Sequence, residues 1–98
     1  MQSEQEYAIL VDVNYMEHNE IASSIFASLY CEFRIHGFTL ENRMFIKKGT
    51  DANIKSDLSD IMKNLAGYHG TQVLNIFIKH VSMVKKSTFK NIKNDLLK

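Results

Sequence analysis

The chain has 98 residues, 45% of them hydrophobic, a formal net charge of +1 and one cysteine. This length suffices for one domain with one core, and a single cysteine excludes a disulfide framework or a multi-cysteine zinc site within one chain. No run approaches the roughly 18 apolar residues that a membrane span needs, and the polar N-terminus shows no secretion signal. We therefore expect a cytoplasmic protein with no membrane partner.

The charges are unevenly distributed along the chain. Residues 1–41 carry seven acids and one base, whereas residues 42–98 carry eleven bases and four acids. A basic half is typical of a surface that contacts a nucleic-acid phosphate backbone, but a solvated lysine-rich surface gives the same pattern. Charge alone leaves both interpretations open.

The first predicted element is a buried strand at residues 7–14. Residues 7–11 are all apolar, so both faces of the strand are expected to be covered, as in the centre of a sheet. Asp12 follows directly, at the C-terminal end of the strand, where open α/β sheets form ligand crevices. Asp12 is the best single candidate for chemistry, and the alternative is that it only caps the following turn.

A helix and a hairpin are expected next. An apolar stripe at helical spacing predicts a helix over residues 20–36, capped by Asn14 or Asn19 and ended by Gly37. Residues 38–40 and 43–47 then read as the two arms of a hairpin.

A second helix and a last strand complete the pattern. The second helix carries its stripe from Ile54 to Leu65, with Asp51 or Asn53 as cap and Gly67 as its end. Residues 73–81 are apolar on both faces and predict the last strand.

This order predicts an α+β fold, the ferredoxin-like βαββαβ sandwich, in which two helices cover one face of a four-stranded antiparallel sheet. The first and third strands are central in that topology, and the last strand lies at an edge. An apolar edge strand invites aggregation unless something covers it, so we expect a homodimer.

The chain divides into a polar N-terminal extension (1–6), the ferredoxin-like domain (7–81) and a basic amphipathic tail (82–98). Residues 85–98 have the spacing of a short basic C-terminal helix. Docking on its own domain or on a partner subunit is the favoured use of this helix, ahead of direct contact with nucleic acid or a membrane.

Several other reactive side chains are interpreted as structural. Cys31 lies within a helical pattern and has no paired base, so it is expected to pack. The four histidines lie far apart in sequence, and Asp57 and Asp60 share a helix surface with lysines, which favours solvated ion pairs.

The residues now described resemble a known family. The run 7–13, the helix that leads into His36-Gly37-Phe38-Thr39, the hairpin arm 43–46 and the strand 73–81 resemble the virulence-associated protein D family, which is itself similar to the small CRISPR-associated protein 2 nucleases. The likeness covers about residues 7–81. It implies a ferredoxin-like homodimer with endoribonuclease activity or nucleic-acid handling, in a toxin–antitoxin or invader-defence setting, with Asp12 as the principal carboxylate.

The chain departs from that family at two places. The family typically has a Gln-Gly-Ser-Val-Tyr run in the hairpin, whereas residues 42–46 here contain no serine. The aspartate that family members tend to carry at the start of the last strand is also absent, because residues 72–74 are Gln, Val and Leu. These differences bear on catalysis more than on the fold.

The resemblance implies metal-dependent hydrolysis of RNA. Asp12 of each subunit would be the catalytic residue and the ligand of Mg²⁺ or Mn²⁺, which orients water and neutralises charge on the phosphate. Arg43, Lys47 and Lys48 would contact the RNA, or another nucleic acid, through its backbone.

Two other interpretations remain. One is a non-catalytic dimeric adaptor of the same fold, which binds nucleic acid or a protein such as an antitoxin and in which Asp12 is structural; the missing serine and aspartate favour it. The other is a nuclease domain of the NYN or PIN type. Because such domains need more acids on later strands and a longer chain, it ranks last.

Overall fold

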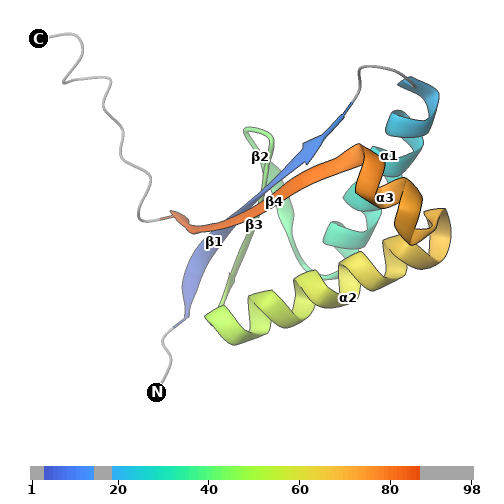
Figure 1. Ribbon diagram of the computed structural model, residues 1–98. Helices are drawn as coiled ribbons and strands as arrows, with labels where there is room; N and C mark the ends of the chain where they lie inside the picture. Colours follow the sequence, from blue (N-terminus) through green and yellow to red (C-terminus); the bar gives the residue numbers. More distant parts are fainter. Residues whose placement is uncertain (1–3, 15–18, 87–98) are drawn as a thin grey trace, which may run out of the picture.

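The computed structural model describes residues 4–14 and 19–86, which form a four-stranded antiparallel sheet and three helices (Figure 1). The elements in chain order are β1 (Gln5–Val13), α1 (Asn19–Ile35), β2 (Thr39–Glu41), β3 (Met44–Gly49), α2 (Asp51–His69), α3 (Thr71–Phe77) and β4 (Ile78–Lys85). The strand order is β2-β3-β1-β4. The predicted α+β class is confirmed, because one antiparallel sheet is combined with helices. The predicted strand positions are confirmed as well: β1 and β3 are central, and β4 lies at an edge.

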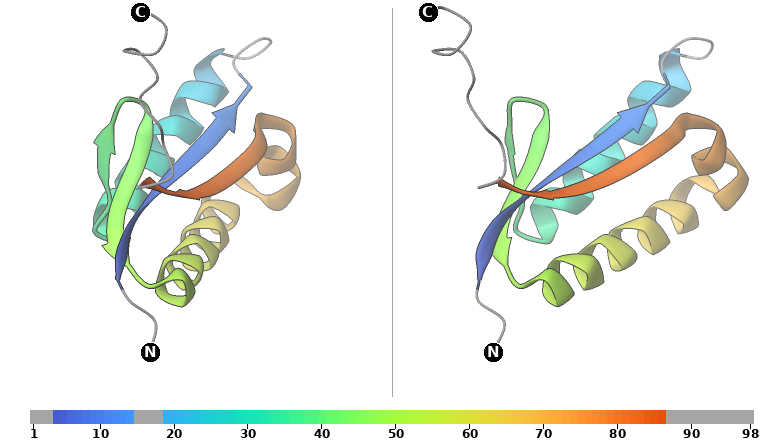
Figure 2. Two further views of the ribbon diagram at one scale, coloured as in Figure 1. Left: turned by 90° about the vertical axis from the view of Figure 1, so that its left-hand side faces the viewer. Right: turned by 60° about the vertical axis from the view of Figure 1, so that its left-hand side comes forward.

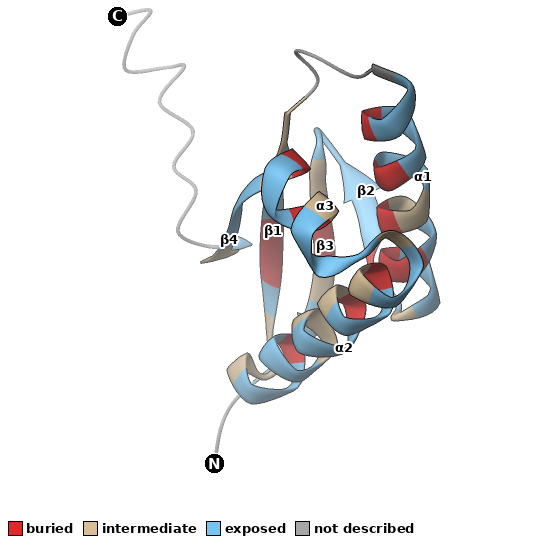
Figure 3. Cartoon of the chain, turned by 45° about the vertical axis from the view of Figure 1, so that its right-hand side comes forward, coloured by how far each residue is buried: buried red, intermediate tan, exposed pale blue. Residues whose placement is uncertain are grey.

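The core lies between one face of the sheet and the helices. Buried residues of β1 and β3 form one cluster with buried residues of all three helices. Figure 3 shows these buried stretches in red. Phe33 of α1 stacks on Phe45 of β3 with ring centroids 4.1 Å apart, and it also meets Phe38 edge to face at 5.0 Å. These aromatic contacts fix α1 against the hairpin formed by β2 and β3.

Gly37 ends α1 as the sequence predicts. Its φ of 89° lies in the region that glycine adopts without strain. Its backbone N–H donates to Arg34 O, and the N–H of Phe38 donates to Phe33 O. This is the Schellman pattern, and the Phe33–Phe38 contact is the apolar pair that accompanies it.

The bounds of α2 differ from the prediction at both ends. Thr50, rather than Asp51 or Asn53, is the N-cap, because its hydroxyl accepts the N–H of Asn53 at 3.2 Å. The helix also passes through Gly67 and ends at Gly70, whose φ is 89°. Glycine within a helix costs only about 1 kcal/mol, so helical packing on either side of Gly67 outweighs it.

The prediction of a strand from residue 73 was wrong in its first half. Residues 71–77 form helix α3, and β4 begins only at Ile78. Val73, Leu74 and Phe77 have helical spacing, and the last two are buried in the core. A short apolar run does not distinguish a buried strand from a buried helix turn, and here tertiary packing selects the helix.

β4 is therefore less apolar than expected. The strand Ile78–Lys85 is mostly exposed, and it extends four residues into the segment assigned to the tail. The argument for a dimer from an edge strand with two apolar faces loses its basis, because most of those apolar residues lie in α3. The predicted helix of the tail falls on residues 87–98, outside the described residues.

No helix covers the other face of the sheet in the part of the chain that the structure describes (Figure 2). We call this the open face, and it carries the side chains of Ala8, Leu10, Met44, Ile46 and Val84. On this face Leu10 is 39% exposed, whereas Ala8 and Ile46 are buried. Within residues 4–14 and 19–86, no helix is long and apolar enough to cross a membrane.

Candidate functional site

Asp12 lies near the C-terminal end of β1, and its side chain is exposed. A bulge in the pairing of β1 with β4 falls between Asp12 and Val13. Bulges often re-aim side chains next to active sites. Within the described residues the Asp12 carboxylate has no hydrogen bond or ion pair. The turn that it would cap, residues 15–18, lies outside the described residues.

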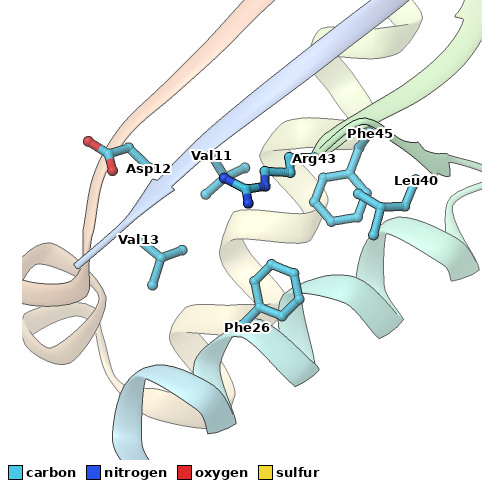
Figure 4. Close-up of a pocket in the computed structure, with 7 residues that line it drawn as sticks. All are labelled: Val11, Asp12, Val13, Phe26, Leu40, Arg43 and Phe45. Atoms are coloured by element: carbon cyan, nitrogen blue, oxygen red, sulfur yellow. The ribbon is translucent and has the colours of Figure 1, made fainter. Parts of the chain in front are cut away.

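Asp12 also lies at the rim of a pocket of about 410 Å³. The pocket is lined by Val11, Asp12, Val13, Phe26, Leu40, Arg43 and Phe45. Figure 4 shows Val13 and Phe26 within the hollow, whereas the Asp12 carboxylate points away from it, to the other side of β1. The Asp12 carboxylate therefore lies on the open face, whereas the hollow is lined by Arg43 and apolar side chains.

The side chain of Arg43 is positioned by a strained turn between β2 and β3. Asn42 and Arg43 have φ values of 50° and 67°. Positive φ at both central residues is the type I′ geometry, which favours Asn-Gly. Arginine at the second position costs backbone energy, and strain of this kind is frequent where a side chain is needed for function.

His80 is a candidate that sequence reasoning missed. It lies opposite Asp12 in the β1–β4 register, and both side chains are exposed. Directly opposed residues have Cβ atoms about 5 Å apart, so one ligand can contact both. The sequence does not reveal that His80 lies beside Asp12, because the two residues are 68 positions apart and their pairing depends on where β4 begins.

The predicted contact residue Lys47 is engaged within the fold. Its ammonium donates to His36 O at 2.6 Å and to Asp57 Oδ2 at 2.7 Å, and it lies 5.5 Å from the centroid of Phe38. The side chain thus joins β3 to the end of α1 and to α2. These bonds indicate a structural role.

Lys48 is exposed at the opposite end of the sheet from Asp12, opposite Glu6. Nearby, Lys86 pairs with Glu6 at 3.2 Å and with Glu41 at 3.3 Å. Hydrogen bonds to Glu6 and then to Glu41 raise the pKa of the Lys86 ammonium above its ordinary value. The structure thus brings Arg43 to the same end of the sheet as Asp12, and places Lys47 and Lys48 elsewhere.

A buried carboxylate on the helices is a second feature that the sequence did not reveal. Glu32 of α1 is 4% exposed and accepts hydrogen bonds from Asn64 and Tyr68 of α2, each at 3.1 Å. The bond to Glu32 is the main reason that the pKa of the Tyr68 phenol is raised. Because both carboxylate oxygens are satisfied by α2, Glu32 holds the two helices together.

The donor set for a divalent ion is incomplete in one chain. Among the described residues, no three His, Cys, Asp or Glu side chains come together in a way that could hold a metal ion. Mg²⁺ is usually held by one or two carboxylates while it keeps several waters. Asp12 supplies one such carboxylate in each chain, and a second copy of the chain would supply another.

Comparisons with known proteins give no assignment: a scan against protein-family models and a search of curated proteins both find no match for this chain.

Proposed function

We propose that this protein is a metal-dependent endoribonuclease that acts as a homodimer, with Asp12 as its catalytic carboxylate. The observation that carries the proposal is the exposed Asp12 side chain, free of partners in the described residues, at a bulge on the central strand. A carboxylate held on a rigid strand and left without an internal partner is suited to bind an ion or a substrate.

The dimer is proposed to form through the open face. Leu10 is two residues from Asp12 on the same strand and points to the same face, where it is 39% exposed. Met44 and Val84 flank it and are half-buried. If two copies pack through this apolar strip with their Asp12 carboxylates adjacent, repulsion between the carboxylates would favour the binding of a cation.

Each side chain then has a distinct role. Asp12 of each subunit would hold Mg²⁺ or Mn²⁺, and the ion would supply charge neutralisation at the scissile phosphate. Asp12 would bind the ion and fix its position, and Arg43 would contact the phosphate backbone of the RNA. His80 lies opposite Asp12 in the strand register, and we propose it as the group that takes a proton from water or gives one to the leaving oxygen.

RNA cleavage tests the proposal. Purified protein is incubated with single-stranded RNA in Mg²⁺, in Mn²⁺ and in EDTA, and its mass is measured by sedimentation. We expect a dimer that cleaves only with metal. A monomer, or a dimer whose cleavage is unaffected by EDTA, would contradict the metal-dependent mechanism.

The second candidate is a non-catalytic dimeric adaptor of the same fold. It is favoured by the bonds of Lys47, which remove one expected RNA contact, and by the fact that Asp12 is the single carboxylate at the site among the described residues. Such a protein binds RNA, or a protein partner such as an antitoxin, and cleaves nothing. Binding without cleavage in every metal would favour the adaptor.

A further inference from the structure

Two hollows meet at Leu40 of β2, and residues of α1 line both of them. The first is the pocket of about 410 Å³ at the end of β1. The second, of about 460 Å³, is lined by residues of α1, the Gly37 turn and β2. Leu40 lines both hollows. We define the α1–β2 groove by Phe26, Tyr30, Arg34, Leu40 and Arg43.

The groove is electropositive. Of the described residues that line the two hollows, Arg34 and Arg43 are basic and only Asp12 is acidic. The Asp12 carboxylate points away from the hollow (Figure 4). Glu41, which follows Leu40 on β2, is paired with Lys86. The two guanidinium groups therefore dominate the charge along the groove.

The groove also offers aromatic rings. Phe26, Tyr30 and Arg34 are spaced four residues apart on α1, so they follow one side of the helix. Phe26 is 37% exposed, and Tyr30 is half-buried beside Phe45. An exposed ring is a surface on which an unpaired base can stack.

The guanidinium group of Arg34 lies over the ring of Tyr30. Its Nη1 donates to Tyr30 Oη at 3.3 Å, and its guanidinium lies 5.7 Å from the Tyr30 ring centroid. This contact occupies one N–H group and leaves the others for a phosphate, since arginine has five donors. Arg43, at the other end of the groove, has no hydrogen bond or ion pair within the described residues.

Rings for stacking and guanidinium groups for phosphates are the features of single-stranded nucleic-acid sites. A duplex keeps its bases stacked on each other and hides them from such rings. We propose that the α1–β2 groove binds a single-stranded RNA segment, with Arg34 and Arg43 on phosphates and Phe26 and Tyr30 against bases. The proposal rests on the proposed function for its choice of RNA, and it names the form of that RNA.

The test measures binding separately from cleavage. Fluorescence anisotropy of a short labelled oligouridine is followed in EDTA for wild type, Arg34→Gln, Phe26→Leu and the matched control Lys63→Gln. Lys63 is exposed on α2, outside the groove. The same RNA annealed into a duplex is the second probe. Circular dichroism and melting temperature verify that each variant is folded.

The two substitutions have different expected signatures. Arg34→Gln weakens binding about tenfold and lowers the slope of log affinity against log salt by about 0.7, the value for one lost phosphate contact on a single strand. Phe26→Leu weakens binding about fivefold with the salt slope unchanged, because it removes a ring and no charge. Lys63→Gln binds like wild type, and the duplex binds more weakly than the single strand.

Equal binding by wild type and both groove variants would overturn the proposal, and so would preference for the duplex. No binding of oligouridine at all would also overturn the proposal. That result would favour, as the ligand, an extended peptide that pairs with the edge strand β2. Cleavage of RNA by groove variants at the wild-type rate supports the proposed function but contradicts the groove. Groove-dependent binding without cleavage supports the groove and contradicts the nuclease.

Discussion

Lys47 of β3 donates to Asp57 of α2 at 2.7 Å, with the two side chains 29% and 22% exposed. This half-buried pair fastens the sheet to the helical layer, and the same ammonium satisfies a carbonyl at the end of α1. A residue in the basic half of the sequence thus supports the fold. The two roles, structural bond and RNA contact, predict opposite results on substitution.

Lys47→Met is expected to lower the free energy of unfolding by about 1–2 kcal/mol, because it removes a partly screened ion pair and leaves a carbonyl without its donor. RNA affinity should stay near the wild-type value. Urea denaturation and anisotropy measure the two quantities. Lys48→Gln is the comparison: Lys48 is exposed and free of ion pairs in the described residues, so this change should spare stability. The reverse pattern would make Lys47 the contact.

Arg43→Gly is expected to stabilise the protein and weaken RNA binding together. Glycine relieves the left-handed conformation at φ 67°, worth about 1 kcal/mol, and removes the guanidinium from the groove. The denaturation midpoint and the oligouridine affinity give the two effects. Asn42→Gly is the control, because asparagine already tolerates this conformation and the change should gain less. A loss of stability in Arg43→Gly would show that the arginine side chain supports the turn.

Tyr68 is expected to titrate above the ordinary pKa of a tyrosine. Its hydrogen bond to Glu32 holds the phenolic proton and raises its pKa above the ordinary value of 10.0. A pKa that is higher in the folded state means that the bond stabilises the fold below pH 10.0 and that this contribution is lost as the pH rises through the folded pKa. Absorbance at alkaline pH follows the titration, and Tyr68→Phe identifies the tyrosine. The claim fails if that variant removes a step at or below the ordinary value.

The dimer prediction depends on Leu10. Leu10→Glu places a charge on the open face, where the side chain is already 39% exposed, so the fold should survive while the dimer dissociates. Sedimentation gives the mass, and circular dichroism gives the helix content. Ile76→Glu on α3, where the side chain is 61% exposed, is the matched control and should leave the dimer intact. A Leu10→Glu protein that still sediments as a dimer would place the interface elsewhere.

The sequence predicts the fold well where its hydrophobic period is clear. The stripe of α1, its end at Gly37 and the strand order around β1 follow from local pattern and capping chemistry. Residues 73–77 are predicted as a strand but form a helix, because a short apolar run has no decisive period. Burial of Leu74 and Phe77 decides the conformation of this run. Gly67 misleads because the helix continues past it to Gly70.

The site is predicted only in part for a different reason. Asp12 is visible as a carboxylate at the end of an apolar run, whereas His80 and Arg34 become relevant only through strand register and groove geometry. Lys47 is assigned to RNA from charge alone, since no local signal reveals Asp57 as its partner. Glu32 looks like a helix surface residue until Asn64 and Tyr68 of another helix reach it.

The central claim is that Asp12 binds the ion on which RNA cleavage depends. Asp12→Asn keeps the shape of the side chain and removes its charge, so a turn residue would tolerate it and a metal ligand would not. The decisive measurement is the RNA cleavage rate in Mn²⁺, taken with the rise in melting temperature that Mn²⁺ produces, for wild type, Asp12→Asn and the control Asp60→Asn on the exposed surface of α2. We predict that Asp12→Asn loses both the cleavage and the metal-dependent rise while it remains a folded dimer, and that Asp60→Asn keeps both; cleavage at the wild-type rate by folded Asp12→Asn would contradict the account.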